Sequence, residues 1–206
     1  WPRAVLAELL EALERQGARA VFFDILFADP DIRNPESETL FNDAVARSRN
    51  SYFAMLRLDR GRDASSELHA SQVPGAVRAS ATGADPTVAM ILPRFPAIIE
   101  SGRVGSVGAH PDRDGMVRRL ALYEEAGAWR IPSLPLAIAR GLGIPVPAAR
   151  EIQLNWRGPP FSYRYVSFAE VHADSLRKQK RRDPREFAGK SNSSSAFLAF
   201  SETWLK

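Results

Sequence analysis

The stretch from Gly17 to Asp31, GARAVFFDILFADPD, constrains the fold of this chain more than any other. In an extended strand, alternate positions of this run would place large apolar side chains on one face: Val21, Phe23, Ile25 and Phe27. The other face would carry Ala20, Phe22 and Leu26, so both faces are apolar, which is typical of a central strand covered by helices on both sides. Asp24 alone interrupts the pattern. A carboxylate at such a position must be paired, hydrogen-bonded or functional, because burying an unpaired charge is costly.

Helical and strand patterns alternate around this run. Leucines recur at helical spacing from Arg3 to Gln16, and Gly17 supplies a stop. A second helix is expected from Pro35 to about Arg49, with Asn34 as its N-cap and a buried stripe of Leu40, Phe41, Ala44 and Val45. Ser51 to Leu58 alternates as a strand does. This order predicts an α/β fold, specifically a three-layer domain with a central mixed sheet covered by helices on both faces.

The second half of the chain is less regular. Asp59 to Pro86 has few large apolar residues, and we expect it to be a mobile excursion that contains one short helix. Val117 to Tyr123 is expected to pair with Ala128 to Ile131 in a hairpin. Further elements are expected as follows: short strands at Thr87–Leu92, Glu151–Trp156 and Phe161–Val166, a short helix or turn at Pro93–Glu100, and helices at Ser133–Leu142 and after the Ser167/Glu170 capping box.

Length and composition fit one globular domain. The chain has 206 residues, 45% of them hydrophobic, which is enough to bury a core. We expect the domain to span residues 1–190 and a Ser/Asn-rich tail to follow at 191–206. Because the chain begins at Trp1 and not at Met, we also expect it to be part of a longer protein. No window approaches the roughly 20 continuous apolar residues that a transmembrane helix needs.

The net charge of +4 comes from one segment. Residues 177–190 carry seven Lys and Arg against two acidic residues, so the rest of the chain is not basic. A run of this kind is usually a solvated segment, and Arg177 to Arg185 contains no aromatic residue on which a nucleic-acid base could stack. We therefore expect no nucleic-acid partner. The absence of cysteine excludes disulfides and thiolate metal sites, and the three histidines lack zinc-ligand spacing: His69, His110 and His172.

The candidate ligand-binding residues are charged interruptions of apolar strands. Asp24, Asp29 and Asp31 follow the central strand, at the end where open α/β sheets place their ligands. Asp24 has a second interpretation, which we favour: a buried carboxylate that bonds backbone amides or pairs with an arginine such as Arg3 or Arg118. Asp29 and Asp31 remain the part of this stretch most open to a ligand.

The other candidates are Asp112, Asp114 and Arg118. An Asp-rich turn could bind a hard cation, but the spacing of a calcium loop is missing, so we favour a simple turn. Arg118 shares strand parity with apolar residues and is expected near the core, where it could turn back toward Asp112 and Asp114 or toward an anionic ligand. Our hypothesis is that this segment and Asp24 to Asp31 form one polar site. We expect no catalytic residue, metal ligand or cofactor.

The order of these motifs resembles a known family. WPR at the start, the FDILF segment at Phe23–Phe27, the DRDG segment at Asp112–Gly115 with Arg118, and the Ser-Leu-Pro-Leu-Ala helix are together similar to the second family of CHASE-type domains. These are extracytoplasmic sensory domains of bacterial adenylate cyclases, histidine kinases and Ser/Thr kinases. The resemblance reaches to about Lys190. A Ser/Asn run then stands where the family has a hydrophobic strand, so either that strand is displaced to Ala196–Phe200 or the C-terminus is not family sequence.

The resemblance implies an input module and no catalysis by the domain itself. An unknown small-molecule or environmental signal would change the conformation or the homodimer contacts of the domain, and flanking membrane segments of the parent receptor would carry the change inward. The domain would lie on the periplasmic or extracellular face of the bacterial inner membrane. Two alternatives stay open: a metal-dependent hydrolase or phosphoryl-transfer domain that uses Asp24, Asp112 and Asp114, and a ligand-free dimerisation module.

Overall fold

The computed structural model of the chain describes residues 1–108, 110–155, 166–176 and 198–201. The chain divides into two compact units, which are taken one at a time below. The helical unit comprises Trp1–Val21, Pro30–Ser51 and Asn155–Leu198, and the sheet unit comprises Phe22–Asp29, Tyr52–Leu154 and Ala199–Lys206. Helices, parallel pairs and antiparallel pairs are all present, so the predicted α/β class with a mixed sheet is confirmed. The three-layer arrangement stays a prediction.

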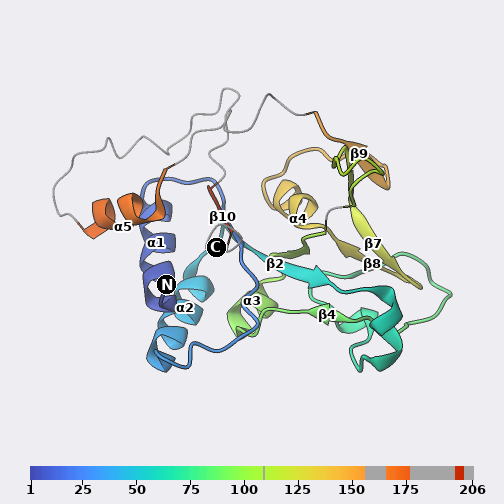
Figure 1. Ribbon diagram of the computed structural model, residues 1–206, viewed down its shortest axis with the longest axis horizontal. Coiled ribbons are helices and arrows are strands. Elements are labelled where there is room, and N and C mark those ends of the chain that lie inside the picture. Colours follow the sequence, from blue (N-terminus) through green and yellow to red (C-terminus); the bar gives the residue numbers. More distant parts are fainter. Residues whose placement is uncertain (109, 156–165, 177–197, 202–206) are drawn as a thin grey trace. The chain divides into compact units, whose positions relative to one another are not determined.

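The described residues of the helical unit form three helices, α1 (Arg3–Arg15), α2 (Pro35–Arg47) and α5 (Phe168–Leu176), and α1 packs against both others (Figure 1). The leucines of the α1 stripe are buried: Leu6, Leu9, Leu10 and Leu13. An ion pair of 2.7 Å joins Arg47 of α2 to Glu11 of α1. The contact with α5 includes a hydrogen bond of 3.0 Å between His172 and Glu8.

The predicted helix α2 is confirmed with two changes. Asn34 occupies the N-cap and Pro35 the first turn, as the sequence indicates, but the helix ends at Arg47 rather than near Arg49. Phe41, Ala44 and Val45 are buried, whereas Leu40 is 55% exposed, so its place in the buried stripe was wrong. The three buried positions already form a stripe of 3.6-residue periodicity, and Leu40 lies at its margin.

The sheet unit centres on a five-stranded sheet in which β2 (Ser51–Arg57) is flanked by β1 (Val21–Asp24), β4 (Met90–Ile91) and β5 (Val104–Ser106). β5 runs parallel to β2 with Ala54 opposite Gly105, and β4 runs antiparallel to it with Leu56 opposite Ile91. The fifth strand, β10 (Leu198–Ser201), lies beside β1 and overlaps Ala196–Phe200, one of the two alternatives given for the last strand. The short helix α3 (Pro96–Ser101) ends at Gly102, whose φ of 64° suits glycine.

The core of the sheet unit is an aromatic cluster on the strand face predicted from the sequence. Phe23 and Phe53 stack with ring centroids 5.3 Å apart, and Phe27 packs edge-on against Phe23, Phe53 and Phe95 at 5.7, 6.0 and 6.0 Å. All four are buried. β1 ends at Asp24, earlier than the apolar run, because the chain then leaves the ladder and the Phe27 carbonyl accepts a hydrogen bond from the Arg94 amide at 2.9 Å.

Residues 59–86 form defined elements, contrary to the expected mobile excursion. They contain two 3₁₀ helices, η1 (Arg60–Ser65) and η2 (Ala70–Gln72), and the strand β3 (Val77–Arg78). Asp63 explains why this segment is ordered. Its carboxylate pairs with Arg57 of β2 at 2.6 Å and accepts a hydrogen bond from the Ala89 amide at 2.8 Å. Asp63 thus ties the start of this segment to β2 and to the residues just before β4, and Ala70 and Val73 are buried further along it.

The predicted hairpin exists with a different first strand. β7 (Tyr123–Ala126) pairs with β8 (Trp129–Pro132) around Gly127, and β3 adds to the other edge of β8. The preceding β6 (Arg119–Ala121) pairs instead with β9 (Glu151–Gln153). Leu122 separates the two strands, since its amide donates to the Arg150 carbonyl and its carbonyl accepts from Ser133.

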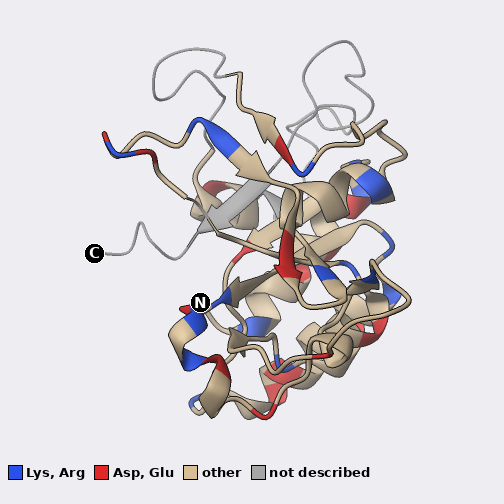
Figure 2. Cartoon of the chain, turned by 90° about the vertical axis from the view of Figure 1, so that its right-hand side faces the viewer, with Lys and Arg blue, Asp and Glu red and all other residues tan. Residues whose placement is uncertain are grey.

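Helix α4 (Leu134–Gly141) follows β8 directly and has Ser133 as its N-cap, as predicted. The strand expected at Phe161–Val166 lies outside the described residues, apart from Val166. Lys and Arg segments are interspersed with Asp and Glu segments along the described chain (Figure 2), in agreement with the expectation that the body is not basic.

Candidate functional site

The six candidate ligand residues fall in different parts of the chain. Asp31 belongs to the helical unit, and the other five belong to the sheet unit. Within the sheet unit, the structure brings together Asp112, Asp114 and Arg118. No described residue links Asp24 or Asp29 to this group by a hydrogen bond or ion pair. That all of them serve one ligand site therefore stays a prediction.

Ion pairs between Arg118 and the two aspartates hold the turn from Asp112 to Arg118 together. The Arg118 guanidinium donates to both carboxylate oxygens of Asp114, at 2.9 and 2.7 Å, and to Asp112 at 3.0 Å. Gly115 has a φ of 81° and donates its amide to the Asp112 carbonyl, which forms the turn. The hydrogen bond from Arg118 holds the pKa of the Asp114 carboxyl below its usual value, and the two aspartates raise the pKa of Arg118.

This cluster lies at the surface, so the expectation that Arg118 approaches the core was wrong. The Arg118 side chain is 46% exposed and that of Asp114 is 55% exposed. The chain is irregular until β6 begins at Arg119, so strand parity does not apply to Arg118. Among the described residues, no three His, Asp or Glu side chains converge as metal ligands would. The aspartates are engaged by arginine, which favours the ion-paired turn that the sequence suggested.

Asp24 stands at the end of β1 as an exposed residue, so the expectation of a buried carboxylate at this position was wrong. Neighbouring protein removes part of its hydration and raises the pKa of its carboxyl above the usual value. Asp29 is exposed as well. Their assignment to a ligand site remains a proposal.

Asp31 has a structural role at the start of α2. Its carboxylate accepts hydrogen bonds from the Ser37 hydroxyl at 3.0 Å and from the Asn34 amide at 3.1 Å, and its own amide donates to Glu38 at 2.7 Å. Desolvation acts to raise the pKa of Asp31, but the hydrogen bonds from Ser37, Asn34 and the Arg3 backbone outweigh it and lower that pKa. A carboxylate here also compensates the helix dipole.

A pocket of about 400 Å³ adjoins Asp31 in the helical unit. Its other lining residues come from the N-terminus and from the loop before α2: Trp1, Pro2, Arg3, Pro30, Arg33 and Asn34. Because the Asp31 oxygens already accept hydrogen bonds from Ser37 and Asn34, the carboxylate is better placed to hold the loop than to bind a ligand.

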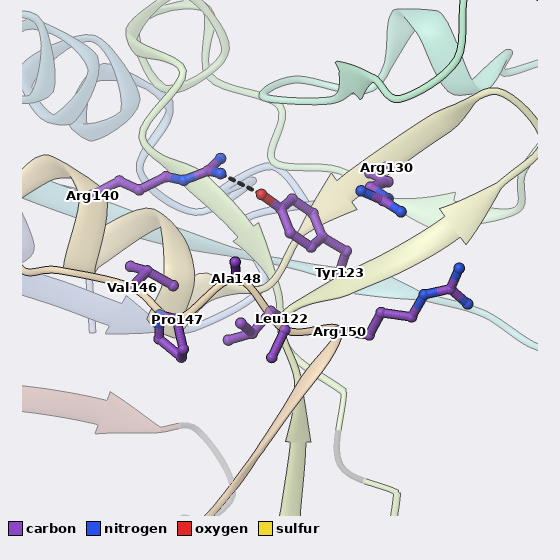
Figure 3. Close-up of a pocket in the computed structure, with 9 residues that line it drawn as sticks. Leu122, Tyr123, Arg130, Arg140, Val146, Pro147, Ala148 and Arg150 are labelled. Carbon is purple, nitrogen blue, oxygen red and sulfur yellow. Dashed lines mark hydrogen bonds between the residues drawn. The ribbon is translucent and has the colours of Figure 1, made fainter.

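A second pocket, of about 420 Å³, lies entirely within the sheet unit and was not predicted from the sequence (Figure 3). We call it the arginine pocket; it is lined by Leu122, Tyr123, Arg130, Arg140, Val146, Pro147, Ala148, Ala149 and Arg150. Its walls are the β7–β8 hairpin, the last turn of α4 and the loop that leads to β9.

Tyr123 lies at the centre of the polar side of this pocket. Its hydroxyl accepts a hydrogen bond from the Arg140 guanidinium, drawn as the dashed line in Figure 3. The guanidinium carbons of Arg140 and Arg130 lie 5.3 and 5.7 Å from the centroid of the Tyr123 ring, within cation–π range. Arg130 also pairs with Glu125 at 3.0 Å. Two cations therefore fix the orientation of the ring.

No local sequence pattern predicts this pocket. Arg140 occurs in the last turn of a helix, where arginine ordinarily offsets the helix dipole, and Arg130 and Arg150 belong to separate strands or loops. Only the pairing of β7 with β8 and the return of the chain after α4 bring them together. The arrangement can bind an anion, since it offers guanidinium groups and a tyrosine hydroxyl beside an apolar wall.

Among the described residues, no helix is both long enough and apolar enough to cross a membrane. The sequence model of the CHASE2 domain family matches residues 1–191. No curated protein and no solved structure matches the chain. The matched range contains every candidate residue described above, including the arginine pocket.

Proposed function

The chain belongs to the CHASE2 domain family, a family of extracellular sensory domains of receptors, and from that premise we propose that it is the extracytoplasmic input domain of a membrane-anchored bacterial receptor. The single observation that carries this proposal is the family match over residues 1–191. CHASE2 domains are sensory and not catalytic, so the chemistry of the receptor would reside in another part of the protein.

The proposed receptor is an adenylate cyclase, a histidine kinase or a Ser/Thr kinase. Its signal would be a ligand that binds two conformations, or two dimer arrangements, of this domain with different affinity, because only a differential affinity shifts a population. Flanking membrane segments would carry the change to a cytoplasmic output domain. The domain would lie on the periplasmic or extracellular face of the inner membrane.

The location can be tested with a single introduced thiol, because the chain contains no cysteine of its own. Ala81 is exposed, and Ala81→Cys in the full-length receptor should react with a membrane-impermeant maleimide in cells whose outer barrier has been opened. Ala54, which is 0% exposed in β2, provides the matched control: Ala54→Cys should react only after denaturation.

Two results would refute the proposed location. One is labelling of Ala81→Cys only after the inner membrane is lysed. The other is a full reading frame without a membrane-spanning or membrane-anchoring segment beside this region.

A further inference from the structure

We propose that the arginine pocket binds a small organic oxyanion, namely a carboxylate or phosphate group attached to a compact apolar body. The oxyanion would contact Arg140 and the Tyr123 hydroxyl, and the apolar body would pack on the loop between α4 and β9. No residue of this site is among the candidates that the sequence indicated.

The charge of the lining selects an anion. Three arginines contribute to the pocket and no Asp or Glu does. Arg130 has a carboxylate partner in Glu125, but no described carboxylate pairs with Arg140 or Arg150. A guanidinium presents parallel N–H donors that match the two oxygens of a carboxylate or phosphate. The described residues thus leave two cations of this pocket for a ligand.

The Tyr123 hydroxyl supplies a directional hydrogen-bond donor beside the Arg140 guanidinium. Its oxygen accepts the hydrogen bond from Arg140, so its own proton is available as a donor. The ring is fixed by Arg130 and Arg140, which lie over it at 5.7 and 5.3 Å. Figure 3 shows the Tyr123 hydroxyl and the Arg140 guanidinium pointing toward each other, which places two donors close to a single anionic group.

The remaining wall is apolar and held in place before any ligand binds. Leu122, Val146, Pro147 and Ala148 supply it, as Figure 3 shows. The loop is fixed at both ends, by the hydrogen bond from the Ile144 amide to the Ala139 carbonyl and by that from the Leu122 amide to the Arg150 carbonyl, each of 2.8 Å. A wall that does not have to be ordered on binding reduces the entropic cost of association.

The volume suits a metabolite-sized ligand. The pocket measures about 420 Å³, toward the lower end of the roughly 300–1,000 Å³ of small-molecule sites. A single ring or a short branched chain that carries one oxyanion would fill it. Binding at this site does not depend on the proposed sensory function; only the role of the bound anion as the signal rests on that function.

The test is calorimetric titration of the purified 206-residue chain with benzoate and with phenyl phosphate, and with benzamide as the neutral control. We expect saturable binding of at least one of the two anions and none of benzamide, and the preference between the anions distinguishes a carboxylate from a phosphate ligand. Affinity should fall as salt rises, because the interaction is electrostatic and partly exposed. Arg140→Gln should weaken binding about ten- to a hundredfold, and Tyr123→Phe about tenfold.

Arg113→Gln is the matched control variant, since it removes one exposed positive charge outside the pocket. It should bind as the wild-type chain does, and unchanged melting of all three variants would exclude misfolding as the cause of any loss. The proposal is overturned if neither anion binds up to about 10 mM, or if Arg113→Gln weakens binding as much as Arg140→Gln does. Either result would leave the family assignment and the extracytoplasmic location untouched.

Discussion

The ion pair between Arg57 and Asp63 should be among the larger single polar contributions to the stability of the sheet unit. Asp63 accepts two hydrogen bonds from the Arg57 guanidinium, at 2.7 and 2.6 Å, and one from the Ala89 amide at 2.8 Å. The Arg57 side chain is 10% exposed and that of Asp63 is 27% exposed. Arg57 is therefore a nearly buried cation whose charge is balanced by a single partly buried carboxylate.

Asp63→Asn removes this charge and leaves Arg57 in place. Losing one partner of a fully buried pair costs about 3–5 kcal/mol, and because Asp63 retains some contact with water we expect about 2–4 kcal/mol here. For a chain of this size that loss lowers the melting temperature by roughly 4–16 °C. Urea denaturation and calorimetry measure it directly.

The effect should also depend on pH. The hydrogen bond from Arg57 lowers the pKa of Asp63 below its usual value. A carboxyl with a lowered pKa stabilises the folded state above its unfolded pKa, and this contribution disappears as the pH falls through the lowered value. The difference between wild-type and Asp63→Asn should therefore be full at pH 7 and shrink below about pH 4.

Asp59→Asn is the control, because Asp59 belongs to the same segment, is exposed and only caps the amide of Gly61. It should change the free energy of unfolding by less than about 0.5 kcal/mol. If Asp63→Asn is as stable as Asp59→Asn at pH 7, the argument that the Arg57–Asp63 ion pair orders residues 59–86 is refuted.

Three further substitutions test other parts of the account. Arg118→Ala should barely change the melting temperature, because its pairs with Asp112 and Asp114 are exposed and screened; a large drop in a thermal melt would contradict this geometry. Asp24→Asn should stabilise the chain at pH 7 by up to about 0.5 kcal/mol and lose that advantage as the pH falls, because a carboxyl with a raised pKa favours the folded state only once it is protonated; a pH series of urea denaturation measures this. Gly105→Ala should cost about 1–3 kcal/mol in the same assay, since a Cβ on β5 would clash with the backbone of Leu134, and an unchanged midpoint would show that α4 can move away.

The parts of the fold that the sequence predicts well are those with a strong local pattern. The leucine stripe of α1 and the alternation in β2 each follow from their own residues. The Asn34–Pro35 start of α2 likewise depends on neighbours in sequence. In these segments local preference and tertiary packing agree, so the pattern suffices.

The sequence-based predictions fail where contacts between residues far apart in the sequence determine the structure. Residues 59–86 are ordered in part by the hydrogen bond from the Ala89 amide to Asp63, which joins residues 26 apart in the sequence, so no local pattern reveals it. The first strand of the hairpin was misassigned because Arg119–Ala121 alternates as well as its neighbour does, and only its pairing with β9 separates the two.

In the candidate sites too, contacts within one turn could be foreseen from the sequence and contacts between distant segments could not. The contact of Arg118 with Asp112 and Asp114 was one of the two alternatives drawn from the sequence, because the three residues belong to one turn. The arginine pocket was missed because Arg130 and Arg140 meet at Tyr123 only after the hairpin and α4 have folded. Burial was also misjudged, since strand parity was applied to Arg118 outside any strand.

The most direct test of the central claim is the cytoplasmic output activity of the full-length receptor, measured while an anion is added on the extracytoplasmic side. The anion is whichever of benzoate and phenyl phosphate saturates the purified chain. We predict that output changes in the wild-type receptor and in Arg113→Gln over the same concentration range as binding, and that Arg140→Gln requires about ten to a hundred times more anion. Saturation of the pocket with no change in output would contradict the conclusion that this domain transmits a ligand signal.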